Sequence, residues 1–260
     1  MTKITTEEAA LKLAVLIDAD NARAVIIDGL LTEIASYGDA IVRRIYGDFT
    51  LPSSAQWKKV LHKYAIKPVQ QFAFTSGKNA TDSALIIDAM DLLYTHRFGG
   101  FCIVSSDSDF TSLANRIREE GLQVFGFGEK KTPEAFRNAC NKFIFTEVLR
   151  PVAPPDQSMS QSKKRKQPVK QAKANEPSAQ EFPKEFILEA LNNSYDDTGW
   201  AYIGTFGGYL TKLKPDFDSR LYGFKKLSDL VKGKPEIFET EERVNPGSNT
   251  KVLYLRGRQE

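Results

Sequence analysis

Short, continuous apolar segments recur along the first 150 residues of the chain. They are too short for buried helices, and their unbroken apolar character is typical of strands that are covered on both faces. We therefore predict six central strands in this part of the chain. They are Leu13–Ile17, Ile41–Tyr46, Val69–Phe74, Phe101–Val104, Leu122–Phe127 and Phe143–Val148.

Longer segments with apolar residues three or four positions apart separate these strands, and this spacing predicts helices. The predicted helices are Ala22–Tyr37, Ser53–Tyr64, Asp82–His96, Asp109–Glu120 and Thr132–Asn141. Strands that alternate with helices are typical of an α/β fold, in which helices sandwich a mostly parallel sheet. We predict such a Rossmannoid domain over residues 1–150.

The pattern is interrupted between residues 151 and 180, where Pro, Gln, Ser and Lys dominate and aromatic residues are absent. Such a composition buries too little apolar surface to offset the entropy of the chain, so we predict a disordered linker. Its basic cluster favours binding to a polyanion such as RNA, and the simpler interpretation is a solvated tether. The cluster consists of Lys163, Lys164, Arg165 and Lys166.

After the linker, three helical patterns precede two extended segments, which are joined by a turn-rich loop at 245–249. This order is typical of a small winged-helix α+β domain, which we place at 181–260. The predicted helices are Phe182–Leu191, Ile203–Leu213 and Tyr222–Lys232, and the predicted strands are Ile237–Thr240 and Val252–Arg256.

The composition fits two globular domains, because 41% of the 260 residues are hydrophobic and the net charge is only +3. Cys102 and Cys140 are too few for a disulfide scaffold, and their spacing suits no zinc site. We find no signal peptide and no segment long enough to span a membrane. The expected location is the cytoplasm.

Carboxylates follow two of the predicted strands, at the edge of the sheet where ligands collect. Asp18 ends the first strand, Asp107 and Asp109 follow the fourth, and Asp82 begins a helix at the same edge. Carboxylates that converge repel one another, and an all-oxygen cluster selects Mg²⁺ or Mn²⁺. Such metals activate water and stabilise charge on a transferring phosphoryl group.

A simpler interpretation is that some of these aspartates only cap the helices that follow them, as Asp commonly does. It applies to Asp20, Asp82, Asp107 and Asp109, but not to Asp18 at a strand end. We also expect Asp48 to lie at the periphery of this carboxylate group, and Asp88 and Asp91 to be solvated surface residues.

The chain lacks the residues of several other enzyme classes. His62 and His96 lie within helical patterns, which disfavours His-based ribonuclease chemistry and serine hydrolysis. No glycine-rich phosphate-binding loop is present, which disfavours nucleoside-triphosphate and dinucleotide enzymes.

Three segments carry a resemblance to a known family: LIDADN at Leu16–Asn21, KNATDSALIIDAM at Lys78–Met90, and VSSDSDF at Val104–Phe110. They resemble the motifs of NYN domains of the LabA-like and limkain type, which are PIN-like ribonuclease folds. The resemblance covers about residues 10–150 and implies metal-dependent cleavage of RNA. The residues it implicates are Asp18, Asp82, Asp107 and Asp109, with polar roles for Asn21 and Lys78.

The second domain resembles the OST-HTH (LOTUS) domain over about residues 181–258, chiefly in the stretch Gly207–Phe238. The resemblance implies a winged-helix module that binds RNA or protein partners. Phe224, Leu227 and Leu230 are expected to be core residues. The candidate phosphate contacts are Lys212, Lys214, Arg220, Lys225 and Lys226, and Tyr222 is a candidate for stacking on unpaired bases.

The resulting hypothesis is a Mg²⁺- or Mn²⁺-dependent endoribonuclease with a tethered RNA-binding domain. Asp18 and Asp107 are expected to bind the metal directly, while Asp82 and Asp109 complete the shell or orient the attacking water. One alternative is an RNA-binding adaptor without catalysis. Another is a haloacid-dehalogenase-type phosphatase, suggested by Asp18-Ala19-Asp20, but its remaining motifs are not convincingly placed. The sequence leaves the RNA target, the number of metal ions and the oligomeric state open.

Overall fold

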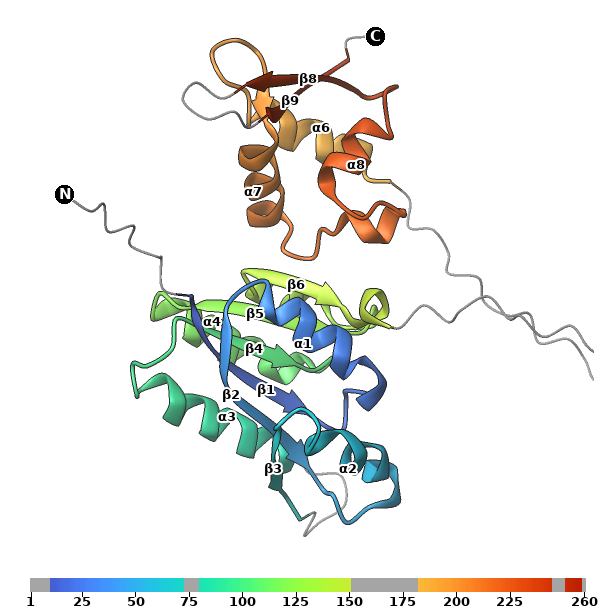
Figure 1. Ribbon diagram of the computed structural model, residues 1–260. Coiled ribbons are helices and arrows are strands. Elements are labelled where there is room, and N and C mark those ends of the chain that lie inside the picture. The colour runs from blue at the N-terminus through green and yellow to red at the C-terminus, as the bar shows by residue number, and fades with distance from the viewer. Residues whose placement is uncertain (1–9, 73–79, 151–181, 245–250, 259–260) are drawn as a thin grey trace, which may run out of the picture.

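The computed structural model describes residues 10–72, 80–150, 182–244 and 251–258 (Figure 1). The predicted linker with its cluster Lys163–Lys166 lies outside the described residues, and so does Lys78. Two domains are present, and Figure 1 shows the C-terminal one stacked above strand β6 of the first. Within the described ranges, no helix is both long enough and apolar enough to cross a membrane.

The first domain is built on a six-stranded sheet in the order β3-β2-β1-β4-β5-β6, and every neighbouring pair is parallel. This confirms the predicted α/β class. The strands are β1 Lys12–Asp18, β2 Asp39–Gly47, β3 Lys67–Gln70, β4 Gly100–Val104, β5 Gln123–Gly128 and β6 Lys142–Phe145.

The last strand is shorter than predicted. Residues Thr146–Leu149 form a 3₁₀ helix, η4, instead of extending β6 to Val148. Val148 and Leu149 still pack into the apolar core, which is why the sequence there keeps its apolar pattern. Burial alone does not distinguish a strand from a single helical turn in so short a segment.

Helices cover both faces of this sheet. On one face lie the 3₁₀ helix η1 Ala24–Ile26 with α1 Ile27–Ala35, and η2 Pro52–Ser54 with α2 Ala55–Leu61. On the other face lie α3 Ala80–Leu93, η3 Ser108–Phe110 with α4 Thr111–Glu119, and α5 Glu134–Ala139. All five predicted helices are present, with shorter α-helical portions.

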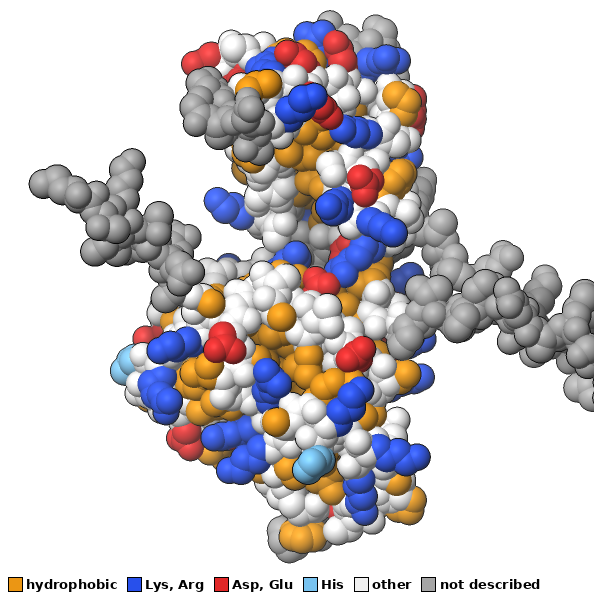
Figure 2. Space-filling model, viewed as in Figure 1, with side chains coloured by type: hydrophobic (Ala, Val, Ile, Leu, Met, Phe, Trp, Pro, Cys, Tyr) orange, Lys and Arg blue, Asp and Glu red, His pale blue; other side chains and the backbone are white. Residues whose placement is uncertain are grey.

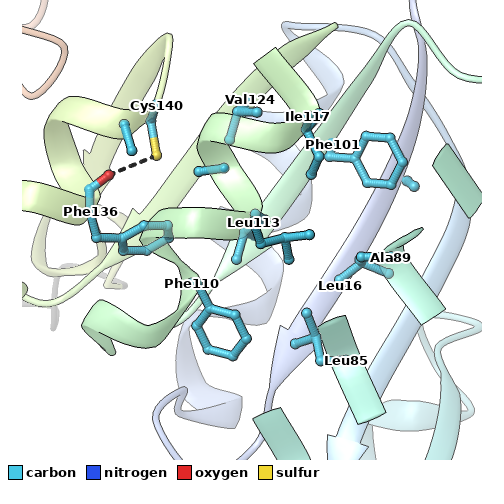
Figure 3. Close-up of a cluster of buried hydrophobic side chains, with 14 of the residues drawn as sticks. Leu16, Leu85, Ala89, Phe101, Phe110, Leu113, Ile117, Val124, Phe136 and Cys140 are labelled. Atoms are coloured by element: carbon cyan, nitrogen blue, oxygen red, sulfur yellow. Dashed lines mark hydrogen bonds between the residues drawn. The ribbon is translucent and has the colours of Figure 1, made fainter. Parts of the chain in front are cut away.

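Strand β1 divides its side chains between the two faces. Leu13, Val15 and Ile17 belong to the core under α1, whereas Leu16 belongs to the core under α3 and α4 shown in Figure 3. Because side chains alternate along a strand, Asp18 continues the Leu16 series and faces α3.

The carboxyl ends of β1 and β4 form a crevice. From β1 the chain proceeds outward to β2 and β3, then crosses back to β4 on the other side of β1. Such a reversal of strand order opens a space for ligands at the carboxyl ends of the two central strands. The fold therefore places Asp18 and Asp107 beside this crevice.

The C-terminal domain packs α6 Lys184–Asn192, α7 Ile203–Leu213 and α8 Leu227–Lys232 against an antiparallel sheet of order β7-β9-β8. Its strands are β7 Ala201–Tyr202, β8 Phe238–Val244 and β9 Lys251–Gly257. Leu230 is fully buried, and Phe224 and Leu227 pack against the core, as expected. Strand β7 was not predicted, because two residues show no periodicity.

The third predicted helix of this domain is divided in two. Tyr222 ends a separate 3₁₀ helix, η5 Ser219–Tyr222, instead of beginning α8. Asp218 caps this short helix, and Gly223 ends it with a φ of 85°, a conformation that favours glycine.

The C-terminal domain contacts the outer edge of β6. The backbone N–H of Phe143 donates a hydrogen bond to the carbonyl of Pro215 (2.9 Å). Arg137 forms an ion pair with the buried Asp216, and Leu221 packs against the core under α3 and α4. Backbone pairing, a charge pair and apolar packing thus join the two domains.

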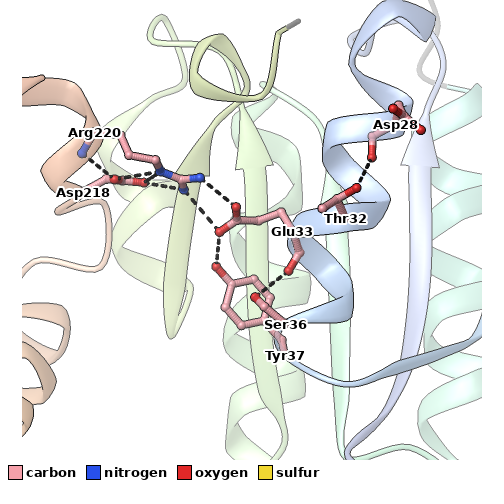
Figure 4. Close-up of polar contacts among 7 residues, drawn as sticks. All are labelled: Asp28, Thr32, Glu33, Ser36, Tyr37, Asp218 and Arg220. Atoms are coloured by element: carbon pink, nitrogen blue, oxygen red, sulfur yellow. Dashed lines mark hydrogen bonds and ion pairs between the residues drawn. The ribbon is translucent and has the colours of Figure 1, made fainter. Parts of the chain in front are cut away.

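Arg220 adds a second charged contact between the domains (Figure 4). Its guanidinium donates to both carboxylate oxygens of Glu33 (2.7 and 3.2 Å) and to Asp218 of its own domain. The Tyr37 hydroxyl also donates to Glu33 (2.6 Å). Burial alone raises the pKa of Glu33, but the hydrogen bonds from Arg220 and Tyr37 and the Arg220 charge outweigh it and lower that pKa.

We predict that Glu33→Gln destabilises the full chain at neutral pH by roughly 1–3 kcal/mol, the cost of losing a charged hydrogen-bond partner. A lowered carboxyl pKa stabilises the folded state above its unfolded value of about 4.5, and this contribution disappears as the pH falls through the folded pKa. The difference should therefore become smaller in acid. Urea denaturation at pH 7 and pH 3 measures it, with the exposed Glu119→Gln as control; equal stability at pH 7 would contradict the prediction.

Candidate metal centre

Three carboxylates converge at the crevice between β1 and β4. One oxygen from each of Asp82, Asp107 and Asp109 lies within 4.8 Å of the others. Asp82 comes from the first turn of α3, Asp107 follows β4, and Asp109 lies in η3. Asp107 also caps η3, because it accepts a hydrogen bond from the Asp109 N–H (2.9 Å). Asp107 therefore caps η3 and also belongs to the carboxylate cluster.

Asp18 is fully buried behind this group. One of its oxygens accepts from the backbone N–H groups of Asp20 (2.9 Å) and Asn21 (3.4 Å). The other accepts from the Asn21 side-chain amide and from the Ser105 hydroxyl, each at 2.8 Å. Burial raises the pKa of Asp18, and these hydrogen bonds oppose the rise. For Asp18 to bind a metal directly, one of the four bonds would have to be exchanged.

Ser105 is a site residue that we did not predict. The register pairs Ile17 with Val104, so the next position places Asp18 opposite Ser105 on the same face of the sheet. The Ser105 hydroxyl also accepts a hydrogen bond from the Asp107 N–H (3.1 Å). A polar residue directly after an apolar strand was the only signal in the sequence.

The negative charges of the clustered carboxylates repel one another. The pKa of Asp82 is raised to about 6, first by burial and then by the negative charges of Asp18, Asp107, Asp109 and Asp20. A bound proton or a divalent cation relieves this repulsion. Since carboxylate oxygens are the hard ligands that Mg²⁺ and Mn²⁺ prefer, the residues present fit such an ion.

Two other aspartates have structural roles. Asp48 accepts hydrogen bonds from Thr50 and Gln70 in the loop after β2. Asp88 accepts from Arg44 and the Tyr46 hydroxyl, so our expectation of a solvated Asp88 was wrong. Its partners come from β2, far away in the sequence, and no local pattern indicates them.

The predicted RNA contacts of the C-terminal domain are in different environments. Lys212 is exposed, the Lys214 ammonium lies over the Phe186 ring (5.8 Å), and Tyr222 is half-buried beside Phe182 and Phe217. An RNA contact by Arg220 would have to replace its bonds to Glu33 and Asp218.

A groove with both basic and acidic residues, Glu33 and Asp218 among the latter, runs between the domains. It is lined on one side by Lys142 of β6 and on the other by the exposed Lys225 and Lys226. Figure 2 shows Lys and Arg side chains gathered around the junction of the two domains. The structure thus keeps two of the predicted lysines accessible to a polyanion.

An aromatic surface that the sequence did not reveal lies on the small sheet. The guanidinium groups of Arg243 and Arg256 lie 5.1 and 4.7 Å from the Trp200 ring centre, and Arg243 also lies over Tyr254. Tyr202 remains 42% exposed beside Tyr254. Rings and guanidinium planes of this kind stack on unpaired bases.

A family model described as NYN domain matches residues 12–149, which is more than half of the chain. The chain belongs to the NYN domain family. A second model, the OST-HTH/LOTUS domain, matches residues 179–250 and confirms the predicted order of domains. NYN domains are PIN-like nucleases that typically use divalent metals, and OST-HTH domains are RNA-binding modules.

Three solved structures are similar to parts of the chain. An uncharacterized protein from Nitrosomonas europaea is 57% identical over 39% of this chain and 94% of its own, with a TM-score of 0.31. A protein of unknown function from Vibrio parahaemolyticus is 17% identical over 52% and 93%, with a TM-score of 0.44. A protein from Chromobacterium violaceum is 28% identical over 32% and 87%, with a TM-score of 0.26. No curated protein matches the chain.

We predict that Asp82→Asn stabilises the metal-free protein at pH 7.5, because it removes a carboxylate that is costly to ionise in the folded state. The raised pKa means that this cost is fully present above pH 6 and is relieved as the pH falls toward the unfolded value of 3.8. The gain in melting temperature in EDTA should therefore disappear near pH 4. The exposed Asp91→Asn is the control, and a lower melting temperature for Asp82→Asn at pH 7.5 would refute the prediction.

Proposed function

We propose that this protein is a metal-dependent endoribonuclease, with a C-terminal domain that binds the RNA. The observation that carries the proposal is the convergence of Asp82, Asp107 and Asp109 at the crevice of a NYN fold. These three carboxylates would hold Mg²⁺ or Mn²⁺, with the charge of Asp18 directly behind them. The direct metal ligation that the sequence suggested for Asp18 stays a prediction.

When bound there, the cation supplies an activated water and charge stabilisation at the scissile phosphate. The protein's own residues hold the side chains around the scissile phosphate in fixed orientations. Asp18 fixes the Asn21 side chain through one amide hydrogen, which leaves its second N–H to donate to an RNA oxygen. The turn after β4 places Asp107 and Asp109 on a rigid element, which favours a fixed ligand geometry.

The C-terminal domain would hold the RNA near this site. Lys212, Lys225 and Lys226 are exposed cations suited to phosphate contacts, and the Trp200 surface is suited to bases. The contacts with β6 would keep this domain at a fixed position relative to the crevice. A protein partner on the same domain is the competing role, and loss of RNA binding on mutation of these residues separates the two.

The decisive variant is Asp107→Asn in the full chain. We expect metal-dependent cleavage of single-stranded RNA to fall by two orders of magnitude or more, on the scale of losing one essential electrostatic group (~10²–10³). Circular dichroism should be unchanged, because the amide retains an oxygen that can accept the Asp109 N–H. Cleavage is measured with Mg²⁺, Mn²⁺ or EDTA, and Asp91→Asn serves as the matched control.

Two results would overturn the proposal. Cleavage by purified Asp107→Asn at the wild-type rate would exclude the site. Binding of RNA by the wild-type chain without cleavage under either metal would establish the adaptor function instead.

A further inference from the structure

Three cations surround one carboxylate on the other side of the crevice. Arg23 and Arg150 lie 3.5 and 3.9 Å from one oxygen of Glu129, and the Lys131 ammonium lies 3.2 Å from the other. The Glu129 side chain is only 16% exposed, whereas those of the cations are 63%, 44% and 67% exposed. The group carries a net charge of +2 and presents its positive ends to solvent.

Glu129, at the centre of this cation group, is bonded to the turn that follows β4. The Glu129 N–H donates to the Ser106 hydroxyl (2.9 Å), while the preceding Ser105 donates to Asp18. A narrow recess beside the cation group is lined by Asn21, Arg23, Ser105, Ser106, Glu129 and Arg150, among others. The cations and the carboxylates are therefore neighbours across a single turn of the backbone.

The loop that carries Glu129 and Lys131 is held by close contacts and hydrogen bonds. A Cβ at Gly128 would lie 2.5 Å from the Thr132 hydroxyl and 2.6 Å from the Ser105 carbonyl, so only glycine permits this close approach. Thr132 is buried and donates to the Glu129 carbonyl through both its N–H (2.9 Å) and its hydroxyl (2.6 Å). The position of Glu129 relative to the acidic cluster is thereby fixed.

The dimensions and donors of the site decide the kind of ligand. The recess offers a volume of only about 10 Å³, close to that of one water, so a nucleobase does not enter it. Glu129 is the ion-pair partner of Arg23, Lys131 and Arg150 in the described part of the chain, and its two oxygens cannot accept from all of their N–H groups, so donors remain for a ligand. Guanidinium and ammonium groups arranged in this way match the oxygens of a phosphate.

We propose that Arg23, Lys131 and Arg150 bind a backbone phosphate of single-stranded RNA, next to the phosphate that the acidic cluster processes. Glu129 lies among the three cations and neutralises part of their positive charge, which leaves the group at +2. The identity of the ligand rests on the proposed function. The arrangement explains how a polyanion approaches a rim of carboxylates: the neighbouring phosphate is attracted where the scissile one is repelled.

The test measures RNA binding by the full chain carrying Asp107→Asn, with a fluorescent single-stranded oligonucleotide in Mg²⁺ over a range of salt concentrations. Adding Arg23→Ala, Lys131→Ala and Arg150→Ala should weaken binding on the order of tenfold or more and reduce the salt slope by about 2, since each phosphate contact contributes ~0.7. The matched control carries Lys12→Ala, Arg97→Ala and Arg116→Ala, which remove the same charge at the opposite edge of the sheet.

Glu129→Gln is an independent test, because it should change RNA affinity in the opposite direction to the triple variant. The substitution keeps the shape of the side chain and raises the charge of the group from +2 to +3, so RNA binding should tighten several-fold. A purely structural Glu129 would leave affinity unchanged or reduce it, and either result would overturn the proposal.

Failure of the inference is distinguishable from failure of the proposed function. If the two triple variants bind RNA equally well, the cation group is not a phosphate site, whatever the wild-type chain cleaves. If the Arg23, Lys131 and Arg150 variant alone loses affinity and the wild-type chain does not cleave RNA, the phosphate site stands and the nuclease proposal falls.

Discussion

A single buried hydroxyl organises the crevice. Ser105 donates to Asp18 at the end of β1 and accepts from the Asp107 N–H, so it connects the two central strands at their carboxyl ends. Without this bond, one oxygen of the buried Asp18 would lose a partner, at a cost of about 1–3 kcal/mol. The orientation of Asn21 depends on the same carboxylate. Asp107 of the acidic cluster and Glu129 of the cation group are therefore both bonded to one short turn.

The sequence predicts most of the fold and the approximate place of the site. Asp18 and Asp107 were found because strand ends in a parallel sheet share an edge, and this rule needs no knowledge of distant contacts. Ser105 could not be found in this way, because its role depends on the register between β1 and β4. Arg220 was expected to contact phosphate and Asp88 to be solvated, but each forms an ion pair. Their partners, Glu33 and Arg44, lie in other elements, so no local pattern indicates them. Local patterns report burial, whereas charge pairing is decided by tertiary structure.

Opposite charges lie side by side at this edge of the sheet without neutralising each other. The carboxylates of the acidic cluster raise the pKa of Asp82, while the cations around Glu129 remain mostly in solvent. Pairing them directly would relieve the repulsion and would also occupy the ligands. Keeping them apart retains the repulsion among the carboxylates, which a bound metal ion would relieve.

The position of the C-terminal domain has a consequence for the sheet itself. Strand β6 is the last strand, so its outer backbone groups face away from β5 and need partners or water. In the full chain the Pro215 carbonyl accepts a hydrogen bond from one of them, the Phe143 N–H. The ion pair between Arg137 and Asp216 lies at the same edge. A chain that ended at residue 150 would present an uncovered edge strand, where a second copy could add its own strand and begin to aggregate. The C-terminal domain thus also covers the edge of the sheet on which it rests.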